Sequence, residues 1–113
     1  MQDIQAKLRH LSLSAQKVRA VIDLVRGKSA NDALEILRFV NKRAALPVRK
    51  LLVSAVANAE ENFGVSRDDL YVAKITADEA PTRKWRRFGA RGRFKPILRR
   101  SSHVTVVLRE RGA

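Results

Sequence analysis

The chain has 113 residues, enough for one domain over residues 1–113 with a single core of modest size. Hydrophobic residues make up 45% of the chain and aromatic residues only 5%, so the expected core is aliphatic. The chain contains no cysteine, which excludes disulfides, thiol catalysis and cysteine-bound zinc. No segment is apolar enough for a signal peptide or a membrane span, so we expect a soluble intracellular protein.

Charge is the strongest feature of the composition. The 24 Lys and Arg residues outnumber the 11 Asp and Glu residues, giving a net charge of +13 and a pI of about 11.4. Residues 1–80 carry a net charge of +3 and residues 81–113 carry +10. A chain this basic repels itself unless an anionic partner neutralises it, and the candidate partners are nucleic acid and an anionic membrane surface.

The first predicted elements are a strand and a helix. Residues 4–11 alternate between apolar and polar side chains, which predicts a half-buried strand. From Ala15 the apolar residues follow helical spacing, and Gly27 is well placed to end that helix. Its predicted buried face consists of Val18, Val21, Ile22 and Val25.

Two more helices are predicted. Ser29 can cap the second helix, whose buried face would include Ala33, Ile36, Leu37 and Val40. A third helix is expected from about residue 43 to about residue 62. Pro47 fits best in its first turn, although a kink is the alternative.

The remaining predicted elements form a long hairpin. Residues 70–77 and 102–109 alternate like strands, and a basic segment without acidic residues lies between them. If the two strands pair, the segment over about residues 80–100 projects as an extended hairpin arm. Ten residues per side would reach roughly 30 Å at about 3.3 Å per residue.

The arm is the main candidate for function. It carries nine basic residues with three aromatic rings between them, a combination that suits phosphates and unstacked bases of RNA. A solvated, disordered basic loop is the alternative, but a regular strand follows the segment. The predicted RNA-binding residues of the arm are Arg83, Lys84, Trp85, Arg86, Arg87, Phe88, Arg91, Arg93, Lys95, Arg99 and Arg100, and Phe94 adds a third ring.

A second basic group lies in the first part of the chain. These residues could form a phosphate-binding face on the globule, or they could be ordinary surface charges. The candidates are Lys7, Arg9, Lys17, Arg19, Arg26, Lys28, Lys42 and Arg43. Of the two histidines, His10 and His103, we expect His103 to face RNA, and the two lack metal-ligand spacing.

Other function classes have weaker support. The adjacent acids Asp78 and Glu79 point to opposite faces of a strand and make a poor catalytic pair. We therefore expect no enzyme activity, no cofactor and no metal. A DNA-binding or general nucleic-acid chaperone function stays open, whereas a membrane-active segment would need an apolar helical face that residues 83–95 do not provide.

Three ordered motifs resemble those of one protein family. Ser14 to Arg19 and Arg26-Gly27-Lys28 resemble an S-P-x-K-V-R stretch followed by R-G-K, and residues 54–60 resemble an S-A-x-A-N-A helix motif. Residues 99–106 resemble a K-R-T-S-H-I-T-V strand. Over about residues 6–110 the order and spacing are similar to those of the large-subunit ribosomal protein L-twenty-two family, bacterial type.

The resemblance implies a fold and a function. The fold would be α+β, with three helices packed on a small antiparallel sheet and a long protruding β-hairpin. The protein would be a structural constituent of the large ribosomal subunit that binds its RNA across several RNA domains and aids assembly. It would reside in the cytoplasm within the ribosome, although an organellar ribosome stays open.

The resemblance also implies partners and a tip. Besides ribosomal RNA, the partners would be neighbouring large-subunit proteins and the nascent peptide, with no membrane contact and no homo-oligomer. The hairpin tip would line the peptide exit tunnel. The tunnel-facing residues would be Arg86, Arg87, Phe88, Gly89, Ala90 and Arg91.

Overall fold

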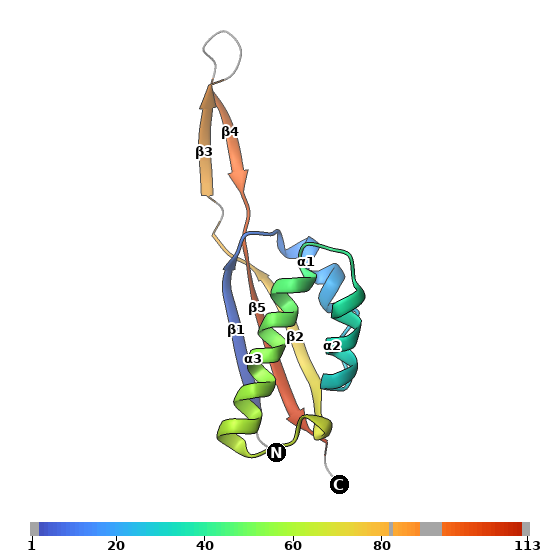
Figure 1. Ribbon diagram of the computed structural model, residues 1–113. Helices are drawn as coiled ribbons and strands as arrows, with labels where there is room; N and C mark the ends of the chain where they lie inside the picture. The colour runs from blue at the N-terminus through green and yellow to red at the C-terminus, as the bar shows by residue number, and fades with distance from the viewer. Residues whose placement is uncertain (1–2, 82, 89–93, 112–113) are drawn as a thin grey trace.

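The computed structural model describes residues 3–81, 83–88 and 94–111, and for residues 83–88 and 94–99 it describes the backbone (Figure 1). Helices and a small sheet form a globule, and a second two-stranded ladder extends from it. In chain order the elements are β1 (Ile4–Leu11), α1 (Ala15–Ile22), α2 (Ala30–Phe39), α3 (Ala45–Phe63), the 3-10 helix η1 (Arg67–Asp69), β2 (Leu70–Glu79), β3 (Arg83–Phe88), β4 (Phe94–Arg99) and β5 (Ser102–Glu110).

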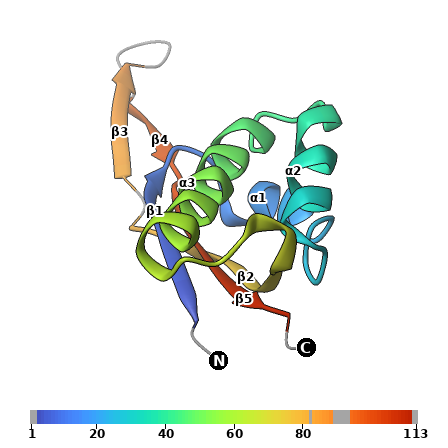
Figure 2. The ribbon, with the colours of Figure 1, turned by 60° about the horizontal axis from the view of Figure 1, so that its bottom comes forward.

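The sheet of the globule is antiparallel, in the order β1-β5-β2. Along the central strand β5, every second side chain is buried, from Ser102 to Leu108. The three helices cover one face of the sheet (Figures 1 and 2). The core therefore lies between this face and the helices, and it is aliphatic as predicted.

The arm continues the pairing of β2 with β5. Glu79 is paired with Ser102, the Ala80 N–H donates to the Ser101 carbonyl at 3.0 Å, and Arg83 is paired with Arg99. The molecule measures 67 × 25 × 18 Å, with a radius of gyration of 17.2 Å. A compact chain of this length would have a radius of about 13 Å, so the arm gives the molecule its elongated shape.

The predicted fold is confirmed, with one helix shorter than expected. α1 ends at Ile22, because Leu24 and Val25 donate to the Val21 and Ile22 carbonyls in tighter 3-10-type turns. Val25 is still fully buried. Gly27, with a φ of 79°, then turns the chain toward β2.

The other helix boundaries follow their sequence patterns. The Ser29 hydroxyl accepts a hydrogen bond from the Asp32 N–H at 3.2 Å and caps α2. Pro47 lies in the first turn of α3, where its missing N–H is not needed. Gly64 ends α3 with a φ of 66°. The sequence patterns did not predict η1.

Candidate nucleic-acid interface

The arm concentrates positive charge on a narrow ladder. The register places Arg83 opposite Arg99 and Arg87 opposite Lys95. Like charges directly opposite each other destabilise a strand pair, and residues 80–100 contain no acidic residue to offset them. The ladder is therefore suited to a polyanion that can lie against it.

The structure describes only part of the predicted arm site. Gly89, Ala90, Arg91 and Arg93 lie outside the described residues. For Arg83 to Phe88 and for Phe94 to Arg99, the register is described and side-chain positions are not. The tunnel-facing assignment is therefore still a prediction.

Several predicted globule residues share the end of the globule from which the arm extends. β1 ends there, α1 and α3 begin there, and the connection between α2 and α3 crosses there (Figures 1 and 2). Predicted binding residues on these segments include Arg9, Lys17, Lys42 and Arg43, all of them exposed. Basic residues thus gather both on the arm and on this end of the globule, and the exposed acids Asp78 and Glu79 lie between them, where β2 ends.

The opposite end of the globule differs in charge. There α3 ends, η1 follows and β2 begins (Figure 1). These segments carry Glu60, Glu61, Asp68 and Asp69. The globule therefore has an acidic end far from the arm and a basic end next to it.

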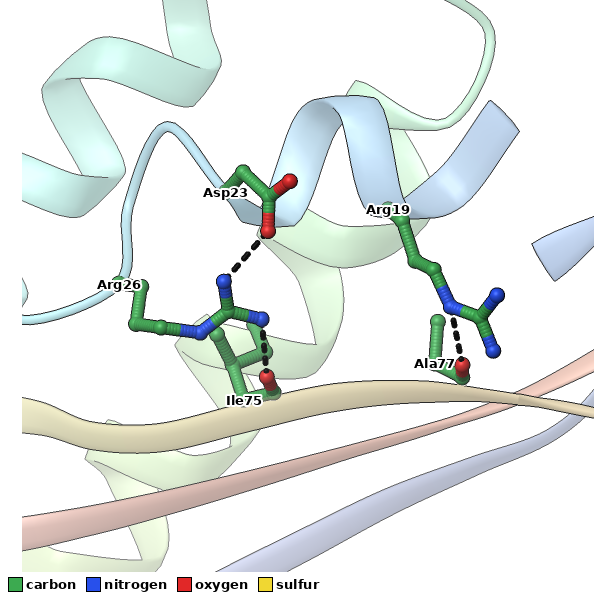
Figure 3. Close-up of polar contacts among 5 residues, drawn as sticks. All are labelled: Arg19, Asp23, Arg26, Ile75 and Ala77. Carbon is green, nitrogen blue, oxygen red and sulfur yellow. Dashed lines mark hydrogen bonds and ion pairs between the residues drawn. The ribbon is translucent and has the colours of Figure 1, made fainter. Parts of the chain in front are cut away.

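Three other predicted residues lie along the outer edge of β2. Arg19 Nε donates to the Ala77 carbonyl at 3.0 Å, and Arg26 Nη2 donates to the Ile75 carbonyl at 2.9 Å (Figure 3). The Lys28 carbonyl accepts from the Val72 N–H at 2.8 Å. These contacts cover backbone groups that an edge strand would otherwise expose.

Arg19 and Arg26 therefore have a structural role whether or not they bind RNA. Arg26 also pairs with Asp23, with 2.5 Å between Nη1 and Oδ1 (Figure 3). Arg19 uses only Nε in these hydrogen bonds, so both of its terminal nitrogens can still donate to a phosphate. Sequence spacing grouped these two residues with the arm-end basic residues, but the fold places them on a different surface.

His103 lies near the base of the arm and contacts the other histidine. Its Nδ1 accepts a hydrogen bond from the His10 N–H at 3.1 Å, and the two rings meet edge to face at 4.7 Å. His10 has a φ of 57°, in the left-handed region. The contact occurs where the β1–β5 register shifts between Leu8 and Leu11, so His103 helps to fix that irregular stretch.

The sequence patterns missed part of the basic end. Arg38, Arg49 and Lys50 flank the α2–α3 connection but were not among the predicted binding residues. The pattern that could have identified them is simple, since residues 38–50 contain five basic and no acidic residues. Phe39, in the same stretch, is the most exposed large hydrophobic residue among the side chains that the structure describes.

Other site types find little support in the described residues. These residues contain no group of three or more His, Asp or Glu side chains arranged to hold a metal ion. No helix among them is long and apolar enough to cross a membrane. An open groove of about 450 Å³ between β1 and α3 is lined by Lys7, Leu8, Leu11, Leu46, Pro47, Lys50, Leu51 and Ser54, none of them an acid or a histidine.

Comparison with protein families gives one match. Residues 6–109 match the family model described as ribosomal protein L22p/L17e. The matched range contains all three helices, β2, both arm strands and most of β1 and β5.

Proposed function

Because the chain belongs to the ribosomal protein L22p/L17e family, a structural family of the large ribosomal subunit that binds ribosomal RNA, we propose that its arm threads between RNA segments. In this proposal the protein contacts several RNA domains and aids their assembly. The tip lines the peptide exit tunnel and meets the nascent peptide. The protein acts as a single copy beside neighbouring ribosomal proteins in cytoplasmic ribosomes of bacterial type.

The observation that carries the proposal is the arm itself. It is a paired ladder that leaves the globule, with nine basic residues and no acidic residue over residues 80–100. An isolated two-stranded ladder is marginal in water, and like charges weaken it further. Packing against RNA phosphates removes both problems, since the anions offset the charges and the RNA supplies a contact surface.

The roles divide between the arm and the globule. The arm guanidinium groups of Arg83, Arg86 and Arg87 would bind phosphates in pairs of parallel hydrogen bonds. Trp85 and Phe88 would stack on bases that the folded RNA leaves unpaired. On the globule, Lys42 and Arg43 would anchor the RNA segments that pass the base of the arm.

Binding through phosphates should depend steeply on salt. Each phosphate contact releases counterions, so the logarithm of the binding constant falls with the logarithm of salt concentration by about 0.7 to 0.9 per contact. For the double variant Arg86→Gln/Arg87→Gln we expect a salt slope shallower by roughly 1.4 to 1.8. The measurement is a salt series of binding to deproteinised large-subunit ribosomal RNA.

The matched control is Lys74→Gln/Arg111→Gln, which removes the same charge from the globule. Lys74 lies on β2 and Arg111 follows β5. This variant should keep the wild-type slope. If the salt slopes of RNA binding are equal for the two variants, the arm contacts no more phosphates than the globule surface does. Equal competition by duplex DNA at matched salt would favour a general nucleic-acid-binding protein instead.

The tunnel assignment needs a separate test. Because the chain has no cysteine, a single cysteine gives a unique attachment point. Ribosomes assembled with Arg91→Cys should crosslink to a stalled nascent peptide, and ribosomes with Lys74→Cys should not. If the variant binds RNA but Arg91→Cys gives no crosslink, the ribosomal role stands and the assignment of the tip to the tunnel wall is wrong.

A further inference from the structure

Phe39, the last residue of α2, leaves most of its ring in water. Its exposed fraction is 74%, against 54% for Leu46 and 42% for Phe63. Leu37, two residues earlier, is buried in the core. At 3.6 residues per turn, Phe39 lies about 200° around the helix from Leu37. The core therefore does not need this ring, and its outward position is open to a partner.

The residues next to Phe39 and after it are basic, whereas Glu35 lies one turn before it on α2. The Arg38 guanidinium lies 5.9 Å from the centre of the ring. Arg38, Lys42, Arg43 and Lys50 are exposed, and Arg49 is half-buried. The ion pairs found among the described residues are Arg26–Asp23, Arg67–Glu60 and Arg109–Asp3. None of the five basic residues around Phe39 is neutralised in this part of the structure.

Phe39 and the connection that follows it, a region called the Phe39 corner below, lie at the same end of the globule as the arm. The connection between α2 and α3, residues 40–44, lies at the end of the globule from which the arm extends (Figures 1 and 2). Phe63 provides an internal comparison, because it ends α3 at the opposite end of the globule, beside Glu60 and Glu61. An exposed phenyl ring thus occurs at both ends, but only Phe39 belongs to a stretch, residues 38–50, that holds five basic and no acidic residues.

We propose that Phe39 is a stacking platform for an unpaired nucleobase, with Lys42 and Arg43 binding the flanking phosphates. The inference rests on the proposed RNA-binding function and specifies its ligand, a single-stranded or looped RNA segment that passes the globule. A ring stacks on the face of any base, and nearby cations hold the charged backbone that carries it. In a paired helix the bases are stacked on one another, so their faces are not accessible to Phe39.

An RNA ligand fits this corner better than a protein surface does. The core of a protein interface is depleted in charged residues, whereas Arg38 lies beside this ring and three more exposed basic residues follow in the next 11 positions, Lys42, Arg43 and Lys50. Leu46, in the first turn of α3, is the other exposed apolar side chain nearby. Protein docking at Phe39 is therefore the alternative that the experiment must separate.

The first test uses tryptophan fluorescence in the full chain. Trp85 is the only tryptophan, so Trp85→Phe gives a silent background. In that background, the emission of Phe39→Trp should be quenched by deproteinised large-subunit ribosomal RNA and by a single-stranded oligonucleotide. A fully paired RNA duplex should quench it far less. The matched control, Phe63→Trp, should respond to none of them.

The second test separates stacking from charge. Phe39→Leu keeps an apolar side chain without a ring and should weaken binding to single-stranded RNA by roughly fivefold or more. Its salt slope should match wild type, because a ring releases no counterions. Phe39→Tyr should restore the affinity. Lys42→Gln/Arg43→Gln should instead make the slope shallower. Thermal unfolding should be unchanged in all of these variants.

The outcomes distinguish this inference from the proposed function. Normal RNA binding by Phe39→Leu together with a silent Phe39→Trp overturns the stacking role and leaves the ribosomal function standing. A fluorescence change with purified large-subunit proteins but not with RNA assigns the corner to protein docking and also overturns the inference. Failure of the wild-type chain to bind ribosomal RNA removes the proposed function itself.

Discussion

The arginines of the globule and those of the arm share the same chemistry but have different surroundings. In the globule, Arg67 and Arg109 pair with carboxylates, Arg19 bonds to a backbone carbonyl, and Arg26 does both. In the arm, nine basic residues stand in a stretch without any acidic residue. Net charge alone therefore does not identify a binding surface, because part of the globule's charge already serves the fold.

The strand pairs of the globule and of the arm also differ in their surroundings. β5 pairs with β1 and β2 and buries every second side chain against the helices. β3 pairs only with β4 among the described residues, and no helix covers that ladder (Figure 1). Apolar burial stabilises the first pairing, whereas a two-stranded ladder by itself is marginal in water, so we expect the second pairing to gain stability from the RNA that the arm is proposed to bind.

The largest expected effect tests this contrast in stability. Leu108→Ala, in the middle of the core, should lower the free energy of unfolding by about 2–5 kcal/mol. Ile97→Ala in β4 should change it by less than about 0.5 kcal/mol. Urea denaturation followed by circular dichroism measures both. A loss of 2 kcal/mol or so in the Ile97 variant would mean that the arm belongs to the globule's cooperative unit.

A smaller effect on stability should distinguish a basic residue that supports the fold, Arg19, from one that is free to bind RNA, Lys17. Arg19→Gln removes the hydrogen bond to Ala77 and should cost about 1 kcal/mol of stability. Lys17→Gln, one turn or less away on α1, should leave stability unchanged, since Lys17 is exposed. Thermal unfolding checks the pair. If the two variants are equally stable, the hydrogen bond from Arg19 to the Ala77 carbonyl does not stabilise the fold.

The smallest effect concerns the ion pair between Asp3 and Arg109. Hydrogen bonding from Arg109 holds the pKa of the Asp3 carboxyl below its ordinary value of 3.8. The folded-state pKa is lowered, so the contribution to stability is present above that ordinary value and is lost as pH falls through the lowered one. In an NMR titration, Arg109→Gln should raise the Asp3 midpoint. An unchanged midpoint would show that the pair does not persist in solution.

Local patterns in the sequence were enough to predict most of the elements. The alternation over Ile4–Leu11, the cap at Ser29 and the place of Pro47 in a first helical turn depend on neighbouring residues, and each lies where its pattern placed it. The basic arm was predictable for the same reason, since its charges are consecutive in the chain. The end of α1 was predicted too late because its apolar spacing is satisfied equally by the tighter turns through Val25.

The sequence by itself determined that the partner is anionic, because residues 81–113 carry +10 of the net charge of +13 and such a concentration favours a polyanion whatever the fold. Only the tertiary structure decided which charges are available to that partner. It brings the α2–α3 connection to the arm end and turns Arg19 and Arg26 onto the edge of β2. The physical reason is that a side chain's availability depends on contacts between residues far apart in the chain, and linear spacing does not encode those contacts.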